Sequence, residues 1–316
     1  MHSIAFRDLL VGELGGEPEY LVARDGSEIR GVLPVMWTGN GEGRICNSLP
    51  FFGSHGGPVA SDRSASEALI DAWNERASDP GTLAATMVEN PFLGRDAPQP
   101  IHELTDERIS QFTVLTGRRD EAEVMAMVSG EARNNVRRAR QRGVSVGLDS
   151  SAMLEVWRIH GENMRALGAP EKSRRFFEAL GTRLRAGEGF DIWTARIDGE
   201  VAAALLVVRF NGVSEYFTSG TRLEYRWHNP HSALLIAALA HEAARGARIW
   251  NWGGTHPEGM NGVFHFKRKW GSREGRYRYF VQVNDRSLLG RTPDELMERF
   301  PGFYVLPFRA LRRSLV

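Results

Sequence analysis

The sequence predicts an α/β protein in which two similar units follow one another, each a mixed, mostly antiparallel sheet flanked by helices. Its 316 residues are enough for two domains of ordinary size. A strand, an Asp-Gly turn and a second strand recur in residues 20–37 and 193–210. Segments with helical periodicity lie before and after each of these patterns. We therefore expect tandem domains at 1–148 and 149–284, and a basic helical tail at 285–316.

The first half begins with helical spacing of apolar residues and continues as strands separated by Gly-rich turns. Between them and the next helix lies a segment rich in Gly and Pro but also apolar, which we expect to line a cleft. Helices are expected at 3–14, 66–77 and 120–142, and strands at 20–24, 29–37, 44–49, 83–88, 111–115 and 144–148.

The second half repeats this order, with two helices, a three-strand meander and further alternation of helix and strand. Asp198-Gly199 and Asn211-Gly212 each separate two strand-forming runs, which is the strongest short-range signal for a hairpin. Helices are expected at 152–167, 173–186, 231–245, 260–268 and 293–300, and strands at 190–197, 201–210, 213–221, 248–252 and 277–283.

Composition excludes several classes of protein. With 42% hydrophobic residues, and 40 Lys and Arg against 39 Asp and Glu, the chain is neither disordered nor collagenous. The longest apolar runs, Val201–Val208 and Ala233–Ala240, are shorter than the ~18–20 residues of a membrane span. We expect a cytoplasmic protein without a membrane span, in which the single cysteine, Cys46, is buried as a small apolar residue.

The sequence disfavours a metal site and a bound cofactor. Pro230 stands between His228 and His231 and prevents the two imidazoles from sharing a regular helical face. A Walker A loop is absent, and no Gly-x-Gly-x-x-Gly opens a helix. Covalent catalysis is disfavoured because Cys46 has no base nearby in sequence, although it stays open because triads are assembled in space.

A cluster of five arginines lies between Arg133 and Arg142. Arg133, Arg137 and Arg140 share one helical face, where guanidinium groups can hold phosphates through charge-assisted hydrogen bonds. The alternative is a solvated helix face with no ligand.

Two further segments suit an anionic ligand. The helix beginning at His231 presents its N-terminus, with unpaired N–H groups and positive dipole charge, although capping by Asn229 explains the same residues. Residues 262–271 combine three cations with three aromatic side chains just after a Gly-rich strand end, which suits a nucleic-acid end or a phosphorylated substrate.

These segments, in this order, resemble the FemAB-like family, whose members have tandem acyltransferase-like domains of the GNAT type. The most specific motif is Phe-Lys-x-x-Trp/Phe-Gly, matched by Phe266, Lys267, Trp270 and Gly271. The other parts are residues 29–34, 49–58 and the arginine helix running into Gly143. The resemblance extends over residues 6–271.

The resemblance implies amide formation, in which a primary amine attacks an activated acyl group without a covalent enzyme intermediate. The expected co-substrate is aminoacyl-tRNA, and the expected acceptor is a small amine or peptide, possibly phosphorylated. Lys267 would supply positive charge near the acyl carbonyl or a donor phosphate. Of Glu215 and Tyr216 on one strand, alternation places only one in the cleft, and we favour Tyr216.

The resemblance also implies residues that bind substrate. Arg137 or Arg138 would hold an acceptor phosphate, and Trp37 with the 51–57 loop would line that side of the cleft. The full set of expected substrate-binding residues is Trp37, Phe51, Ser54, His55, Arg137, Arg138, Glu215, His228, His231, Trp252 and Arg268.

Other readings stay open. The long helical-hairpin arm of the family members that use tRNA has no counterpart in this sequence, although the family also has members without the arm. Acyl-CoA is the alternative donor: the 222–231 loop lacks the Gln/Arg-x-x-Gly-x-Gly/Ala cradle for pyrophosphate, but His228 and His231 could bind phosphate there. A noncatalytic binding module on the same fold is a third reading.

Overall fold

A computed structural model shows two compact units, and it describes residues 3–48, 56–92, 97–167, 171–257 and 262–307. The first unit comprises Met1–Ile109 and Gly275–Val316, and the second comprises Ser110–Glu274. These boundaries differ from those expected at 148 and 284. The division lies elsewhere because the arginine helix packs in the second unit, while the residues after Glu274 return to the first.

The first unit has a sheet of strand order β1-β2-β3-β5-β12-β6, with β4 beside β2. Helix α2 covers one face through Leu69, Ile70 and Trp73, which pack on Cys46 and other core residues. Cys46 is fully buried, as predicted. Its elements are α1 (Ile4–Leu14), β1 (Glu17–Asp25), β2 (Glu28–Asn40), β3 (Gly43–Asn47), β4 (Val59–Ala60), α2 (Arg63–Ala77) and β5 (Thr82–Val88).

Two strands, β6 (Leu104–Val114) and β12 (Arg273–Val283), belong to both units, because each begins in one and ends in the other. After β12 the chain forms η2 (Arg286–Gly290) and α9 (Pro293–Arg299), the helix predicted at 293–300. The segment that follows α9 is held in the first unit. The Asn47 side chain pairs with both the N–H and the C=O of Tyr304, at 2.8 and 2.9 Å.

The second unit has the strand order β6-β11-β10-β9-β8-β7. Both predicted hairpin turns are present, with positive φ at Asp198, Gly199, Asn211 and Gly212. The strands are β7 (Ser145–Leu148), β8 (Phe190–Ile197), β9 (Glu200–Phe210), β10 (Val213–Thr221) and β11 (Ile249–Thr255).

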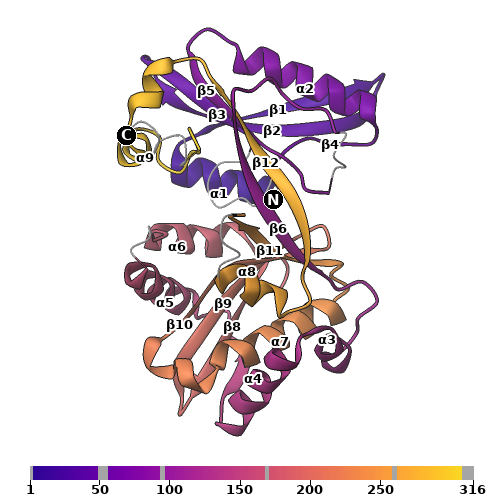
Figure 1. Cartoon of the computed structure of the whole chain (residues 1–316), viewed down its shortest axis with the longest axis vertical. Coiled ribbons are helices and arrows are strands. Elements are labelled where there is room, and N and C mark those ends of the chain that lie inside the picture. The colour runs from indigo at the N-terminus through magenta and orange to yellow at the C-terminus, as the bar shows by residue number, and fades with distance from the viewer. Residues whose placement is uncertain (1–2, 49–55, 93–96, 168–170, 258–261, 308–316) are drawn as a thin grey trace. The chain divides into compact units, whose positions relative to one another are not determined.

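Helices cover both faces of this sheet. On one face α7 packs in the core with α3 and α4 alongside it, and on the other α5 lies against β9 and β10, with α6 beside α5 (Figure 1). The helices are α3 (Glu121–Met127), α4 (Gly130–Gln141), α5 (Met153–Ala166), α6 (Arg174–Arg183), η1 (Leu223–His228), α7 (Pro230–Ala244) and α8 (Gly262–Arg268).

One predicted helix is wrong: the 120–142 segment forms two helices. The break falls at Val128 and Ser129, which have extended backbone, and the Ser129 hydroxyl caps α4 by accepting from the Ala132 N–H at 3.2 Å. The apolar spacing continues across the break because both helices pack on the same core.

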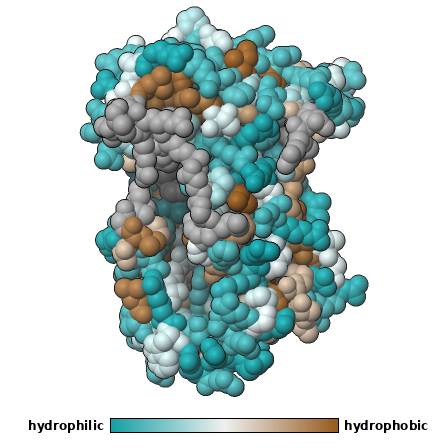
Figure 2. Space-filling model, viewed as in Figure 1, coloured by the Kyte–Doolittle hydropathy of each residue, from teal (hydrophilic) through white to brown (hydrophobic). Residues whose placement is uncertain are grey.

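In the described parts of the chain, no helix is long and apolar enough to cross a membrane. The face drawn in Figure 2 is mostly hydrophilic where it is coloured, and its hydrophobic residues form small, separate patches.

Candidate functional site

In the second unit, β10 and β11 run parallel and then part. Their pairing extends from Val213 with Ile249 to Glu215 with Asn251. Just beyond, the register of β10 against β9 shifts between Tyr216 and Thr218, which indicates a β-bulge. Parallel strands that part at their carboxyl ends open a crevice of the kind in which ligands bind in open α/β sheets.

A cavity of about 400 Å³ lies in the same unit, between the end of β10 and the start of α7. Asn229 holds the N-cap position of α7 without a side-chain capping bond, and its left-handed backbone ends the preceding 3-10 turn, with its N–H donating to the Arg226 carbonyl. The helix N-terminus and Arg226 give the cavity positive character. The cavity is lined by Asn163, Ser219, Gly220, Thr221, Arg226, Asn229, Pro230, His231 and Ser232.

Tyr216, Ser219 and His231 form a hydrogen-bonded group at this cavity. The Tyr216 hydroxyl bonds the Ser219 hydroxyl, and it lies 3.1 Å from Nε2 of His231. Burial lowers the pKa of His231 to about 4 and raises that of Tyr216. At neutral pH the imidazole is therefore uncharged and can accept a hydrogen bond at one ring nitrogen while donating one from the other.

Lys267, the lysine of the family motif, is 5% exposed. Its ammonium donates to the carbonyl oxygens of Gly253 and Gly254, both at 3.2 Å, and to the Thr255 hydroxyl at 2.9 Å. Burial lowers its pKa to about 8. An ammonium has three protons, so these contacts occupy all of them and fix Lys267 to the end of β11.

Two other predicted residues are also buried beside β11. The Glu215 carboxylate accepts from the Asn251 side-chain amide at 2.9 Å, and the indole N–H of Trp252 donates to the Thr113 hydroxyl at 2.9 Å. The Trp252 ring lies 5.1 Å from the ring of Tyr216, between centroids. Trp252 thus supports the cavity from behind rather than lining it.

The predicted cations lie on the surface of the unit. Arg137 and Arg138 are exposed on α4, where Arg137 donates to the Asn134 side chain at 3.1 Å. Arg268 is exposed on α8. His228 is half-buried in η1, and its ring contacts Trp227.

The predicted residues of the first unit cannot all be placed. Phe51, Ser54 and His55 lie outside the described residues. Trp37 is 4% exposed and belongs to the core, where its indole N–H donates to Glu19 at 2.9 Å. Its expected place at the lining of a cleft is therefore corrected to a core position, since a large apolar ring on the helix-covered face of the sheet is stabilised by burial.

Residues 143–147 spell Gly-x-Ser-x-Gly, a pattern of serine nucleophiles. Ser145 begins β7 after a helix, which reverses the strand-to-helix order of a nucleophile elbow. Among the residues that the structure describes, its exposed hydroxyl bonds only the Arg196 carbonyl, at 3.4 Å. The motif thus lacks the structural setting of a nucleophile.

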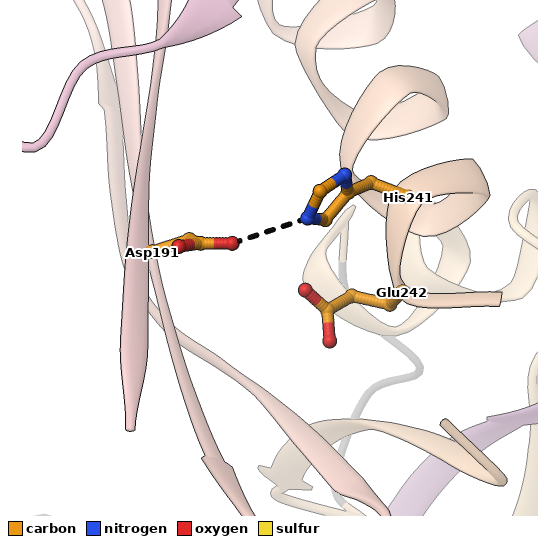
Figure 3. A group of neighbouring side chains, drawn as sticks. All are labelled: Asp191, His241 and Glu242. Atoms are coloured by element: carbon orange, nitrogen blue, oxygen red, sulfur yellow. Dashed lines mark ion pairs between the residues drawn. The ribbon is translucent and has the colours of Figure 1, made fainter. Parts of the chain in front are cut away.

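Asp191, His241 and Glu242 come close enough to one another to hold a cation (Figure 3). His241 and Glu242 are consecutive on α7 and point toward Asp191 on β8. The Arg209 guanidinium already pairs with both carboxylates, and Ser214 donates to Glu242 at 2.6 Å. A cation would have to compete with Arg209, so the group is built as an internal ion-pair cluster.

Several residues of the site were not anticipated. Asn163 on α5 holds the end of β10 by bonding both the C=O and the N–H of Thr221, at 2.9 and 3.2 Å. Gln111 accepts from Thr255 at 3.2 Å and so buttresses the partner of Lys267. Arg226 alone carried a local signal, because it stands close before the Asn-Pro that opens α7.

Comparison with known proteins agrees with this architecture. Residues 130–268 match the family described as the acetyltransferase (GNAT) domain. Among curated proteins, no sequence gives a significant match.

Three solved structures share the fold over most of their length. FemX has a TM-score of 0.68 at 13% identity, covering 90% of this chain and 92% of its own. The C-terminal domain of a putative lysylphosphatidylglycerol synthetase from Agrobacterium fabrum has a TM-score of 0.59 at 15% identity, covering 96% of this chain and 94% of its own. A tandem GNAT protein from the clavulanic acid biosynthesis pathway has 0.51 at 15%, covering 87% of each chain. Residues 130–268 thus match a GNAT domain, and the chain shares the fold of FemX, which is the fold that the FemAB-like resemblance predicts.

Proposed function

We propose that this protein is an N-acyltransferase that moves an aminoacyl group from aminoacyl-tRNA to a primary amine, and that the second unit is the catalytic one. The observation that carries the proposal is the cavity at the start of α7, within the residues that match the GNAT domain. Its helix N-terminus and Arg226 suit the phosphate of an acyl donor.

The reaction requires no nucleophile from the protein. The acceptor nitrogen attacks the ester carbonyl, a C–N bond forms, and the ester C–O bond breaks. The proton lost by nitrogen is finally taken up by the departing ribose oxygen. Neutral His231 and the Tyr216 hydroxyl bound to it can relay this proton, because they form a hydrogen-bonded pair at the cavity.

Lys267 acts in this scheme as a positioning residue. Its three hydrogen bonds fix the Gly-rich end of β11, where the strand has parted from β10. Its positive charge also contributes to the field in which a developing oxyanion is stabilised. In this role Lys267 holds the main chain at the end of β11 in place and does not contact the acyl group directly.

Aminoacyl-tRNA is favoured as the donor by the exposed arginines of α4, which suit a polyphosphate partner. It is also favoured by the structural neighbour named as a putative lysylphosphatidylglycerol synthetase, whose named product is an aminoacylated lipid. The acceptor is a small amine or a peptide, and Arg137 or Arg138 would bind its phosphate if it carries one.

Acyl-CoA is the second candidate donor. It is favoured by the clavulanic acid pathway neighbour, a tandem GNAT protein whose title refers to AcCoA. Against it, residues 223–228 form a 3-10 turn in place of a Gly-rich phosphate loop.

A donor assay separates these possibilities. Purified protein is incubated with a mixed pool of charged tRNA or with acetyl-CoA, each with a panel of amines, and loss of the acyl bond is followed. Consumption of charged tRNA alone supports the proposal, and the amino acid lost identifies the donor. Consumption of the thioester alone reassigns the protein to acyl-CoA chemistry. If neither is consumed with any amine, the fold serves binding without turnover.

A further inference from the structure

An exposed tryptophan is fixed beside the cavity by an arginine from another element. Trp227 of η1 is 62% exposed. The guanidinium carbon of Arg142, the C-cap of α4, lies over its ring at 5.0 Å from the centroid. The same guanidinium donates to the Trp227 carbonyl oxygen. Arg142 thus holds both the ring and the backbone of Trp227.

The exposure of Trp227 does not help to stabilise the core of the unit. A large aromatic side chain left in solvent forgoes the stabilisation that burial would give it. The His228 ring also lies close to this indole, 3.5 Å away between centroids, yet the side chain stays exposed. An exposed indole held in this way is a rigid, flat, electron-rich surface. Such a surface is suited to stack on another flat group.

The surroundings of Trp227 specify the charge of its ligand. Its neighbour Arg226 is exposed, lines the cavity and forms no ion pair with the described residues. Arg138 lies one helical turn before Arg142 and likewise shows no ion pair within the described ranges. Glu224, in the same turn, offsets only one of these charges. The ligand should therefore combine a flat ring with anionic groups.

We infer that Trp227 and Arg142 form a stacking platform for the adenine of a nucleotide whose phosphates point toward Arg226 and the cavity. The inference rests on the proposed function, because both candidate donors contain adenosine. Aminoacyl-tRNA ends in adenosine, and coenzyme A contains an adenosine 3′-phosphate joined to a diphosphate. Aromatic stacking with a nucleobase is tolerant of sequence and is strengthened by a neighbouring guanidinium.

Binding measurements on the full chain test the platform. Two probes are titrated by calorimetry: a short single-stranded RNA ending in CCA, and adenosine 3′,5′-bisphosphate. We expect Trp227→Ala to weaken binding of at least one probe tenfold or more and Trp227→Phe to retain most of the affinity. The matched control is Leu223→Ala, which removes a side chain of 57% exposure from the same turn.

Tighter binding of the RNA assigns the platform to a tRNA donor, and tighter binding of the bisphosphate assigns it to coenzyme A. If Trp227→Ala and Leu223→Ala bind both probes as the parent does, or if the parent binds neither, the platform is refuted. If Trp227→Ala weakens the probes but no donor is consumed, the platform stands and the proposed function fails. If Trp227→Ala consumes a donor with the same KM as the parent, the proposed function stands and the platform fails.

Discussion

Individual side chains of the site were only partly foreseeable from sequence. The motif around Lys267 predicted where a functional lysine lies, but not that its ammonium is bonded to the end of β11. That contact depends on how α8 packs against a strand. Trp37 has the alternation of a strand residue, yet the sequence could not tell which face of the sheet α2 covers.

Replacing Lys267 tests its role at the end of β11. Lys267→Ala should lower the rate of acyl transfer at least tenfold, about 1.4 kcal/mol of transition-state stabilisation. It should also lower the free energy of unfolding by about 1–3 kcal/mol, because buried acceptors lose their donor. Steady-state kinetics and urea unfolding measure the two effects.

The control is Lys269→Ala, two residues further along, which removes an exposed lysine paired with Glu131 at 2.6 Å. We expect it to keep the parent rate and stability. Equal rates for the parent and Lys267→Ala would remove Lys267 from the site.

The half-buried imidazole of His231, whose pKa is lowered, predicts a pH dependence of stability. Its pKa is about 4 in the folded state, below the value of about 6.5 in an unfolded chain. Between these values the unfolded state binds the extra proton, so the free energy of unfolding should fall as pH decreases from 6.5 to 4. In His231→Asn the slope should decrease by up to about 1.4 kcal/mol per pH unit. Urea titrations at pH 4.5, 5.5 and 7 measure it, and identical slopes would contradict the assignment.

At the scale of elements, the sequence was most informative where turn chemistry is local. The Asp-Gly and Asn-Gly pairs predicted their hairpins, since left-handed backbone at two successive residues is a property of the pair itself. The break between α3 and α4 was missed, although Ser129 followed by Gly130 is a cap signal. Continuous apolar spacing outweighed it in our prediction.

Two glycines with open space around them should respond in opposite ways to alanine. Gly199 has a φ of +86° in its turn, so Gly199→Ala should destabilise the protein by about 1–2 kcal/mol. Gly12 lies within α1, where Gly12→Ala should stabilise by up to about 1 kcal/mol. Thermal unfolding of both variants measures the difference. Shifts of the same sign would show that backbone conformation does not decide the outcome.

At the scale of the whole molecule, tandem GNAT-like architecture was predictable but the domain boundaries were not. The contact between Asn47 and Tyr304 joins residues 257 positions apart, and no local sequence pattern predicts it. The residues after β12, expected to form a separate tail, instead belong to the first unit.

Tyr304 should therefore contribute to the stability of the first unit. Its hydroxyl donates to the buried Asp106 carboxylate at 2.8 Å, so Tyr304→Phe should cost about 1.5–3 kcal/mol. Hydrogen exchange should become faster in the first unit before it does in the second. Tyr225→Phe, at a half-buried tyrosine of the second unit, is the control. Uniform acceleration across both units would contradict this placement.

The passage of β6 and β12 between the units has a consequence for biosynthesis. A ribosome that has reached residue 274 has synthesised every residue of the second unit, while the first still lacks everything from Gly275 onward. Since compact units fold as they become complete, the second unit should mature first, although it begins later in the chain. The N-terminal strands must wait, exposed, for β12 to fill the gap between β5 and β6. Chaperone dependence should therefore concentrate in the part of the protein that is translated first.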